Sequence, residues 1–114
     1  MDGAELILLY DYYGALLTER QRECFELRYD QDLSLGEIAQ ELGISRQGVH
    51  DNLTRTEALL KNMEEKTGCV SRDRRCREMA ARVTSLAHSI SNVEDPAVVQ
   101  VVSEILSAAR ELEE

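Results

Sequence analysis

Apolar residues recur at helical spacing along most of the chain. Side chains three and four positions apart share one face of an α-helix, whereas a half-buried strand needs strict alternation of apolar and polar residues. Six segments show the helical spacing: residues 4–17, 18–30, 35–42, 45–66, 70–91 and 96–113. The pattern therefore predicts an all-α protein.

Polar residues and glycines mark the ends of these segments. Thr18 with Gln21, and Ser34 with Glu37, have the capping-box spacing, in which a hydroxyl accepts the amide three residues on and the longer side chain reaches back. Gly43 is expected to end its helix in the left-handed conformation. Further signals are a cap at Ser45, a stop at Gly68 and a helix start at Asp95–Pro96.

The stretch SLGEIAQELGISRQGVHDNLTRTEALL, residues 34–60, carries a more specific pattern. In a helix-turn-helix the first helix crosses the second closely, which suits the small Ala39, and Gly43 supplies the turn. The expected core between the two helices is Ile38, Leu42, Ile44, Val49 and Leu53. The pattern predicts a helix-turn-helix of the kind found in sigma factors, and the alternative is an ordinary helix pair with a glycine turn.

The outward face of helix 45–66 carries side chains that can contact DNA. Gln and Asn can bond adenine, and Arg can bond guanine or a phosphate. Asp51 repels phosphates, although it could accept a hydrogen bond from cytosine. The candidate nucleic-acid contacts are Ser45, Arg46, Gln47, Gly48, His50, Asp51, Asn52, Thr54 and Arg55. The alternative is a solvated polar face, because a fold does not by itself establish a function.

The net charge of -9 is unfavourable for a nucleic-acid-binding protein. Only residues 46–82 are basic overall, with nine Lys and Arg against six Asp and Glu. Four of these form a candidate secondary basic patch: Arg72, Arg74, Arg75 and Arg77. They could follow a nucleic-acid backbone, or they could pair with the acidic helices near the chain ends.

Neither catalysis nor metal binding is indicated. The two histidines and three cysteines lack metal-ligand spacing, and we find no phosphate loop or catalytic triad. We expect no enzyme activity, metal or cofactor, and we expect Cys24 to be a small buried residue. The longest apolar run, Leu6 to Tyr10, is too short to cross a membrane, which favours a cytoplasmic protein.

The C-terminal helices have more apolar surface than a three-helix core needs. We expect a single domain over residues 1–114, with a helix-turn-helix core at 18–66 and a helical extension at 69–114. The extension is predicted to form a homodimer, which would suit palindromic half-sites. The candidate interface is Val98, Val102, Ile105, Ala109 and Leu112. The alternative is that these residues fold back on the N-terminal helix.

Residues 8–60 closely resemble the YlxM family of small bacterial proteins. The markers are Leu9 to Leu17 with its tyrosine pair, Leu17-Thr18 with Gln21-Arg22, the run Asp32 to Ala39, the run Ser45 to Asn52, and Arg55-Thr56-Glu57. The family commonly has Ala and Tyr where this chain has Gly48 and His50, and both departures lie on the recognition face, so the family's base preference is not carried over to this chain. The stretch is also similar to the fourth conserved region of sigma factors.

The resemblance implies a role in protein targeting, because such proteins are typically encoded beside signal-recognition-particle genes. The register of the helix-turn-helix motif and the basic segment 46–82 favour a DNA-binding regulator. The alternative is an accessory module that binds the particle's protein or RNA and no DNA.

Overall fold

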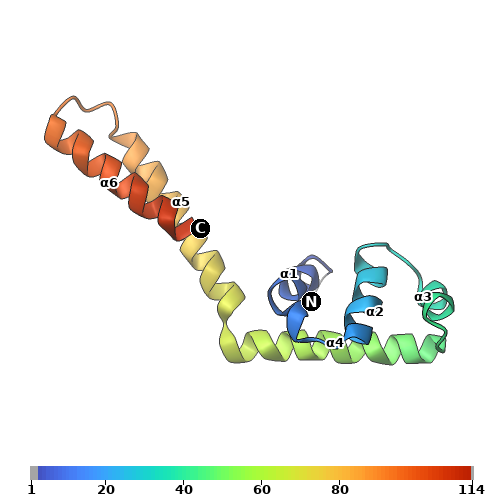
Figure 1. The fold of residues 1–114 in the computed structure, drawn as a ribbon. Helices are drawn as coiled ribbons and strands as arrows, with labels where there is room; N and C mark the ends of the chain where they lie inside the picture. Colours follow the sequence, from blue (N-terminus) through green and yellow to red (C-terminus); the bar gives the residue numbers. More distant parts are fainter. Residues whose placement is uncertain (1–2, 114) are drawn as a thin grey trace. The chain divides into compact units, whose positions relative to one another are not determined.

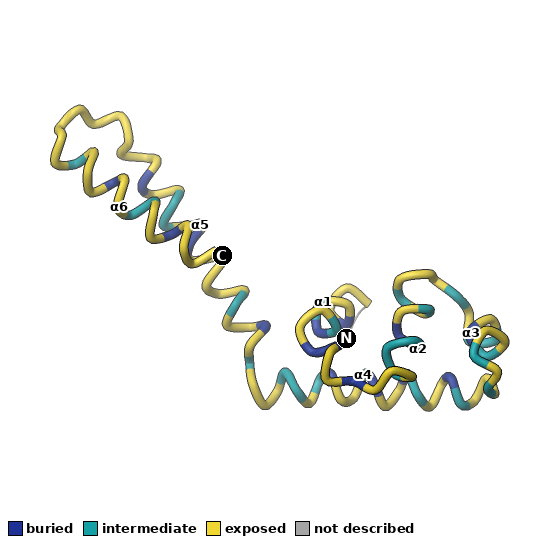
Figure 2. Tube along the Cα trace, in the orientation of Figure 1, coloured by how far each residue is buried: buried dark blue, intermediate teal, exposed yellow. Residues whose placement is uncertain are grey.

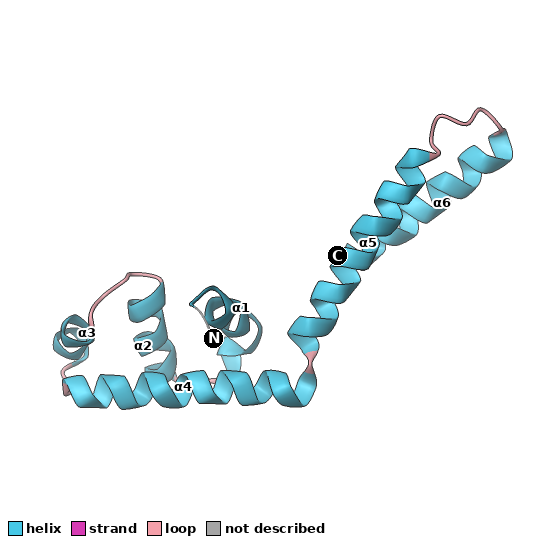
Figure 3. Ribbon diagram, turned by 180° about the vertical axis from the view of Figure 1, so that it is seen from behind, coloured by secondary structure: helices cyan, strands magenta, loops and turns pink. Residues whose placement is uncertain are grey.

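The computed structural model describes residues 3–113, and every regular element in them is helical. Figure 3 shows the elements: α1 (Gly3–Tyr13), the 3₁₀ turn η1 (Gly14–Leu16), α2 (Glu19–Tyr29), α3 (Leu35–Leu42), α4 (Arg46–Thr67), α5 (Cys69–Ser89) and α6 (Pro96–Glu113). The predicted all-α class is confirmed. Contacts divide the chain into two compact units, Met1–Val70 and Ser71–Glu114. The single-domain arrangement stays a prediction.

Several helices begin and end where the capping signals place them. The Thr18 hydroxyl accepts the Gln21 amide at 3.2 Å, and the Gln21 side chain accepts the Thr18 amide at 2.9 Å. Ser34 and Glu37 make the same reciprocal pair, with both distances 3.1 Å. The bond from the Ser34 amide holds the pKa of the Glu37 carboxyl below its usual value. Gly43 ends α3 with a φ of 66°.

The first helix is shorter than the predicted segment 4–17. It ends at Tyr13, and the chain then makes one 3₁₀ turn before Leu17 becomes extended. The Tyr10 ring packs over Gly14, where an added Cβ would lie 3.1 Å from the ring. Leu17, only 5% exposed, takes part in the core from this extended position. The apolar spacing did not reveal the helix end, because Leu17 stays buried after the helix stops, whereas Leu16 in the turn is exposed.

Helix α4 is the element on which the N-terminal unit is assembled. α1, α2 and α3 each contact it, one after another along its length (Figure 1). One core cluster is Leu6, Leu9, Tyr13, Leu17, Phe25, Leu60 and Val70. The other is Cys24, Ile38, Val49 and Leu53, with Leu42 and Ile44 partly buried against it. This second cluster joins the two helices of the helix-turn-helix, and it includes Cys24 as the predicted small buried residue.

An aromatic stack connects the first two helices. The Phe25 ring lies 4.4 Å from the Tyr10 ring and 4.5 Å from the Tyr29 ring, measured between centroids. The Tyr10 hydroxyl donates to Glu26, and the Tyr29 hydroxyl donates to Glu57 of α4, both at 2.6 Å. Burial, together with the neighbouring carboxylate, raises the pKa of each tyrosine to about 12.

Stability is expected to fall in alkaline solution because of these tyrosines. An unfolded tyrosine ionises near pH 10, whereas folded Tyr10 and Tyr29 have a pKa of about 12. The folded state therefore binds more protons between these values, and its advantage is lost as pH rises from about 10 to 12. Urea unfolding followed across this range should show the decline. The variant Tyr29→Phe should decline less steeply, and an unchanged slope would contradict the assignment.

Gly43 is expected to tolerate alanine poorly. Nothing lies within 4 Å of an added Cβ, but the positive φ of 66° is costly for any residue with a side chain, by about 1–2 kcal/mol. Gly36→Ala is the matched control, since its Cβ also meets nothing within 4 Å and the residue is helical. That change should stabilise the protein by up to about 1 kcal/mol. Urea denaturation of both variants measures the difference, and equal effects would contradict the prediction.

The C-terminal unit is a helical hairpin in which α6 folds back along α5. Its buried residues are Ala80 and Ala87 on α5 and Val102 and Ala109 on α6, all at most 5% exposed. The Asp95 carboxylate caps α6 by accepting the amide of Ala97 at 2.9 Å. Two residues of the predicted dimer interface, Val102 and Ala109, are thus already covered within one chain.

Between residues 3 and 113, no helix combines the length and apolar character needed to cross a bilayer. Across the same part of the chain, no three His, Cys, Asp or Glu residues gather as a potential metal site. Cys24 is buried, whereas Cys69 and Cys76 are exposed, and all three are free thiols.

Candidate nucleic-acid interface

The first turn of α4 is fixed by its cap and leaves its polar side chains outside. The Ser45 hydroxyl accepts the Gly48 amide at 2.9 Å, while its carbonyl accepts the Val49 amide at 3.1 Å. Val49 is fully buried, and Arg46 and Gln47 are exposed. Packing of the apolar face therefore determines which side of the helix faces solvent.

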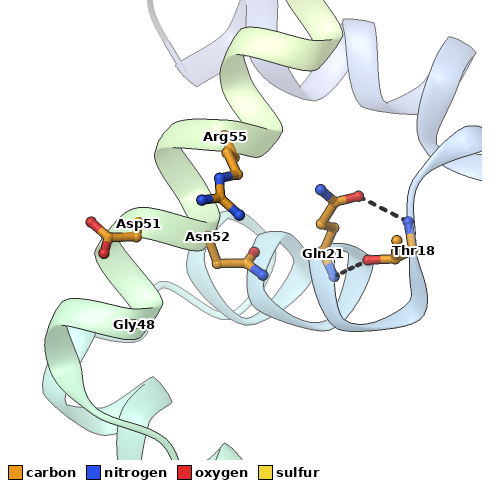
Figure 4. Close-up of a pocket in the computed structure, with 6 residues that line it drawn as sticks. All are labelled: Thr18, Gln21, Gly48, Asp51, Asn52 and Arg55. Carbon is orange, nitrogen blue, oxygen red and sulfur yellow. Dashed lines mark hydrogen bonds between the residues drawn. The ribbon is translucent and has the colours of Figure 1, made fainter.

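Two hollows flank the N-terminal half of α4. The first has a volume of about 430 Å³ and is lined by Thr18, Gln21, Gly48, Asp51, Asn52 and Arg55 (Figure 4). The second, of about 420 Å³, is lined by Leu35, Arg46, Gln47 and His50. The first thus joins α4 to the N-terminus of α2, and the second joins it to the start of α3.

The first hollow combines a cation, amide groups and a helix N-terminus. In Figure 4 the Asn52 side chain points towards Gln21, and the Arg55 guanidinium lies beside them. The Oδ1 atom of Asn52 is buried without a hydrogen-bond partner among the described residues. The Gln21 carbonyl is used by the capping box, which leaves its amide nitrogen as a donor. Arg55 and the N-terminus of α2 both favour an anion in this hollow.

Two acidic residues of α4, Asp51 and Glu57, differ in their orientation. Glu57 is turned away from the exposed face, because its carboxylate accepts the Tyr29 hydroxyl. Asp51 remains exposed and accepts the Gln47 amide at 2.9 Å. Its carboxylate also lies 3.5 Å from Nδ1 of His50, an ion pair only when that ring is protonated. In Figure 4 the Asp51 carboxylate points away from Gln21.

The structure places the nine candidate contacts in four different settings. Gly48, Asp51, Asn52 and Arg55 line the first hollow, Arg46, Gln47 and His50 line the second, and Ser45 caps the helix, while Thr54 is exposed and lines neither. The sequence did not single out Thr18, Gln21 or Leu35 as members of the interface. The capping box at Thr18 was visible, but its position beside Arg55 depends on how α2 packs on α4.

The four arginines of the candidate basic patch do not share one face of α5. Arg72 and Arg75 are neighbours three residues apart, and so are Arg74 and Arg77, but the two pairs project in different directions. All four are exposed. Arg77 pairs with Asp73 of the same helix at 3.2 Å. The four arginines therefore do not form one continuous basic surface on α5.

The fold and this exposed helix define a helix-turn-helix protein. The sequence matches the family described as "Putative helix-turn-helix protein, YlxM / p13 like" over residues 2–98, and the chain belongs to that family. It is 46% identical over 110 residues to a UPF0122 protein of Thermoanaerobacter pseudethanolicus, covering 96% of this chain and 92% of the relative. It is 45% identical over 104 residues to a UPF0122 protein of Acetivibrio thermocellus, covering 88% and 89%. The family resemblance expected from the sequence is confirmed.

Proposed function

We propose that this protein is a regulator that binds double-stranded DNA by placing the N-terminal half of α4 in the major groove. The supporting observation is that polar side chains line hollows on both flanks of this half-helix, while its apolar face is held in the core. In helix-turn-helix proteins the early residues of the second helix contact base edges.

The two hollows suggest different contacts. Arg46 and Gln47 lie in the first turn of α4 and are suited to base edges, because their side chains can make paired hydrogen bonds. Arg55 lies two turns further on, beside the N-terminus of α2, and is suited to a backbone phosphate. Base contacts would give sequence preference, and the phosphate contact would fix the register.

Fluorescence anisotropy tests this proposal. Labelled genomic fragments are titrated with the protein at several salt concentrations, with and without excess non-specific DNA. Binding should weaken steeply with salt and survive the competitor. Arg55→Ala should weaken binding to all sequences alike and reduce the salt slope by about one. Absence of binding even at low salt would contradict the proposal.

A second candidate function is favoured by the net charge of -9. In this alternative the same fold is an accessory module of the signal recognition particle pathway and meets the particle's protein or RNA. The link to that pathway comes from the family resemblance. Co-purification of the particle from cell extract, unaffected by DNase, together with absent DNA binding, would favour the alternative. Loss of the particle on DNase treatment would favour the first proposal.

A further inference from the structure

The C-terminal hairpin leaves much of its apolar surface uncovered. Figure 2 shows most of α5 and α6 in the colour for exposed residues. Six large apolar side chains of these helices and their connecting turn are between 45% and 59% exposed. Val99 lies on one flank of α6, and the other five are Met79, Leu86, Ile90, Val101 and Leu112. A contiguous exposed apolar patch on a folded protein commonly marks an interaction surface.

These five residues lie on one side of the hairpin. On α5, Met79 and Leu86 directly precede the buried Ala80 and Ala87. On α6, Val101 directly precedes the buried Val102. One residue back is a rotation of about 100°. The two helices run in opposite directions and bury residues that face each other. A backward rotation of this size about either helix axis therefore leads to the same side of the plane that contains both helices.

The remaining two members are Leu112 on α6 and Ile90 at the end of α5. Leu112 lies three residues after Ala109 on α6, and Ile90 lies in the turn directly after α5, where its amide donates to the Ala87 carbonyl at 3.3 Å. For Leu112, three residues forward along the helix is equivalent to about 60° of backward rotation, which returns to the same side. Ile90 extends the surface at the end of α5. The half-buried Ile105 lies between the two α6 members. We name the surface formed by Met79, Leu86, Ile90, Val101 and Leu112 the hairpin face.

Charged residues on the outer edges of the hairpin face are of opposite sign. Arg75 and Arg82 each lie four residues before a member on α5, at its outer edge. Glu104 and Glu111 occupy the outer edge of α6. Counted from the centre of the connecting turn, Arg82 and Glu104 are each about eleven residues away, and Arg75 and Glu111 are each about eighteen. The basic and acidic edges are therefore level with each other.

We infer that a second copy of this chain covers the hairpin face and forms an antiparallel four-helix bundle. Two copies can meet through this face about a twofold axis that runs either along the helices or across them. With the axis along the helices, α5 of one copy lies over α6 of the other, and Arg82 and Arg75 meet Glu104 and Glu111. With the axis across the helices, like charges meet. The charge pattern therefore selects the first arrangement, in which the face is complementary to itself.

Sedimentation equilibrium of the full chain, free of nucleic acid, tests this inference separately from DNA binding. The expected mass is twice the 12.9 kDa of the chain. Leu86→Glu with Val101→Glu should give a monomer. Val99→Glu is the matched control, because Val99 is 50% exposed but lies on the opposite flank of α6. A monomeric natural chain, as expected if another protein or the N-terminal unit covers the face, would overturn the inference. Equal loss of dimer in the control would overturn it as well.

Charge reversal tests the arrangement without placing charge in the apolar face. Arg82→Glu and Glu104→Arg should each raise the dimer dissociation constant about tenfold or more, because the twofold axis repeats each unfavourable contact. The double reversal should restore most of the affinity. This test also decides the matter if the glutamate variants of the apolar face lose their helical circular dichroism. Single reversals without effect, or a double reversal that weakens the dimer further, would overturn the proposed pairing.

Discussion

Replacing Arg46 and Gln47 together by alanine is expected to abolish specific DNA binding while the fold survives. Both side chains are exposed in the first turn of α4, where they line the hollow beside Leu35. One paired hydrogen bond to a base contributes about 1–3 kcal/mol of discrimination. Losing two such contacts corresponds to about thirtyfold or more in affinity for the preferred sequence. Competition anisotropy against non-specific DNA measures this loss.

A matched variant separates loss of contact from loss of charge. Gln100→Ala with Arg110→Ala removes the same two side-chain types from exposed positions of α6. It should leave the preference for the selected sequence unchanged. Circular dichroism and thermal unfolding should be similar for both double variants. Sequence preference retained after the change at Arg46 and Gln47 would contradict the assignment of base contacts to this turn.

Phe25→Ala is expected to lower the free energy of unfolding by about 3–5 kcal/mol, the range for truncating a large buried aromatic residue. Phe25 is 1% exposed, and its ring lies between Tyr10 and Tyr29. The change would leave a cavity, remove the contact with Tyr10 across the interface between α1 and α2, and remove the contact with Tyr29 within α2. Since small single domains are stable by only about 5–15 kcal/mol, much of the stability would be lost.

Urea denaturation measures this loss, with Tyr12→Ala as the control. Tyr12 is an aromatic residue of α1 that is 38% exposed and does not belong to the buried cluster. Its truncation should cost less than half as much as that of Phe25. A similar cost for both variants would show that Phe25 does not occupy the centre of the core.

The helix-turn-helix itself could be predicted because its determinants lie close together in the sequence. Each capping box joins residues three positions apart, and the turn depends on the conformation of Gly43 alone. The stripe of Ile38, Val49 and Leu53 then identifies the faces that meet. The end of α1 was missed because Leu17 stays buried after the helix stops, so the apolar spacing did not change there.

The surroundings of α4 could be predicted only in part. Helical periodicity predicts which residues of its first turns are exposed, and most of these residues line the two hollows. The sequence did not show which way the Glu57 side chain points, because that depends on the Tyr29 hydroxyl, which lies 28 residues away in the sequence. The nearness of Thr18 and Gln21 to Arg55 was missed for the same reason.

The sequence by itself determined the helical class, the capping signals and the exposed polar face of the second helix, since these depend on contacts within a few residues. The tertiary structure decided which long-range neighbours the polar groups acquire. It turned Glu57 to Tyr29 and brought the N-terminus of α2 beside Arg55. In the C-terminal hairpin, Val102 and Ala109 are buried, whereas Leu86 and Val101 stay exposed. The apolar spacing of α6 identifies residues that can be buried, whereas the packing of α5 against α6 decides which of them one chain covers.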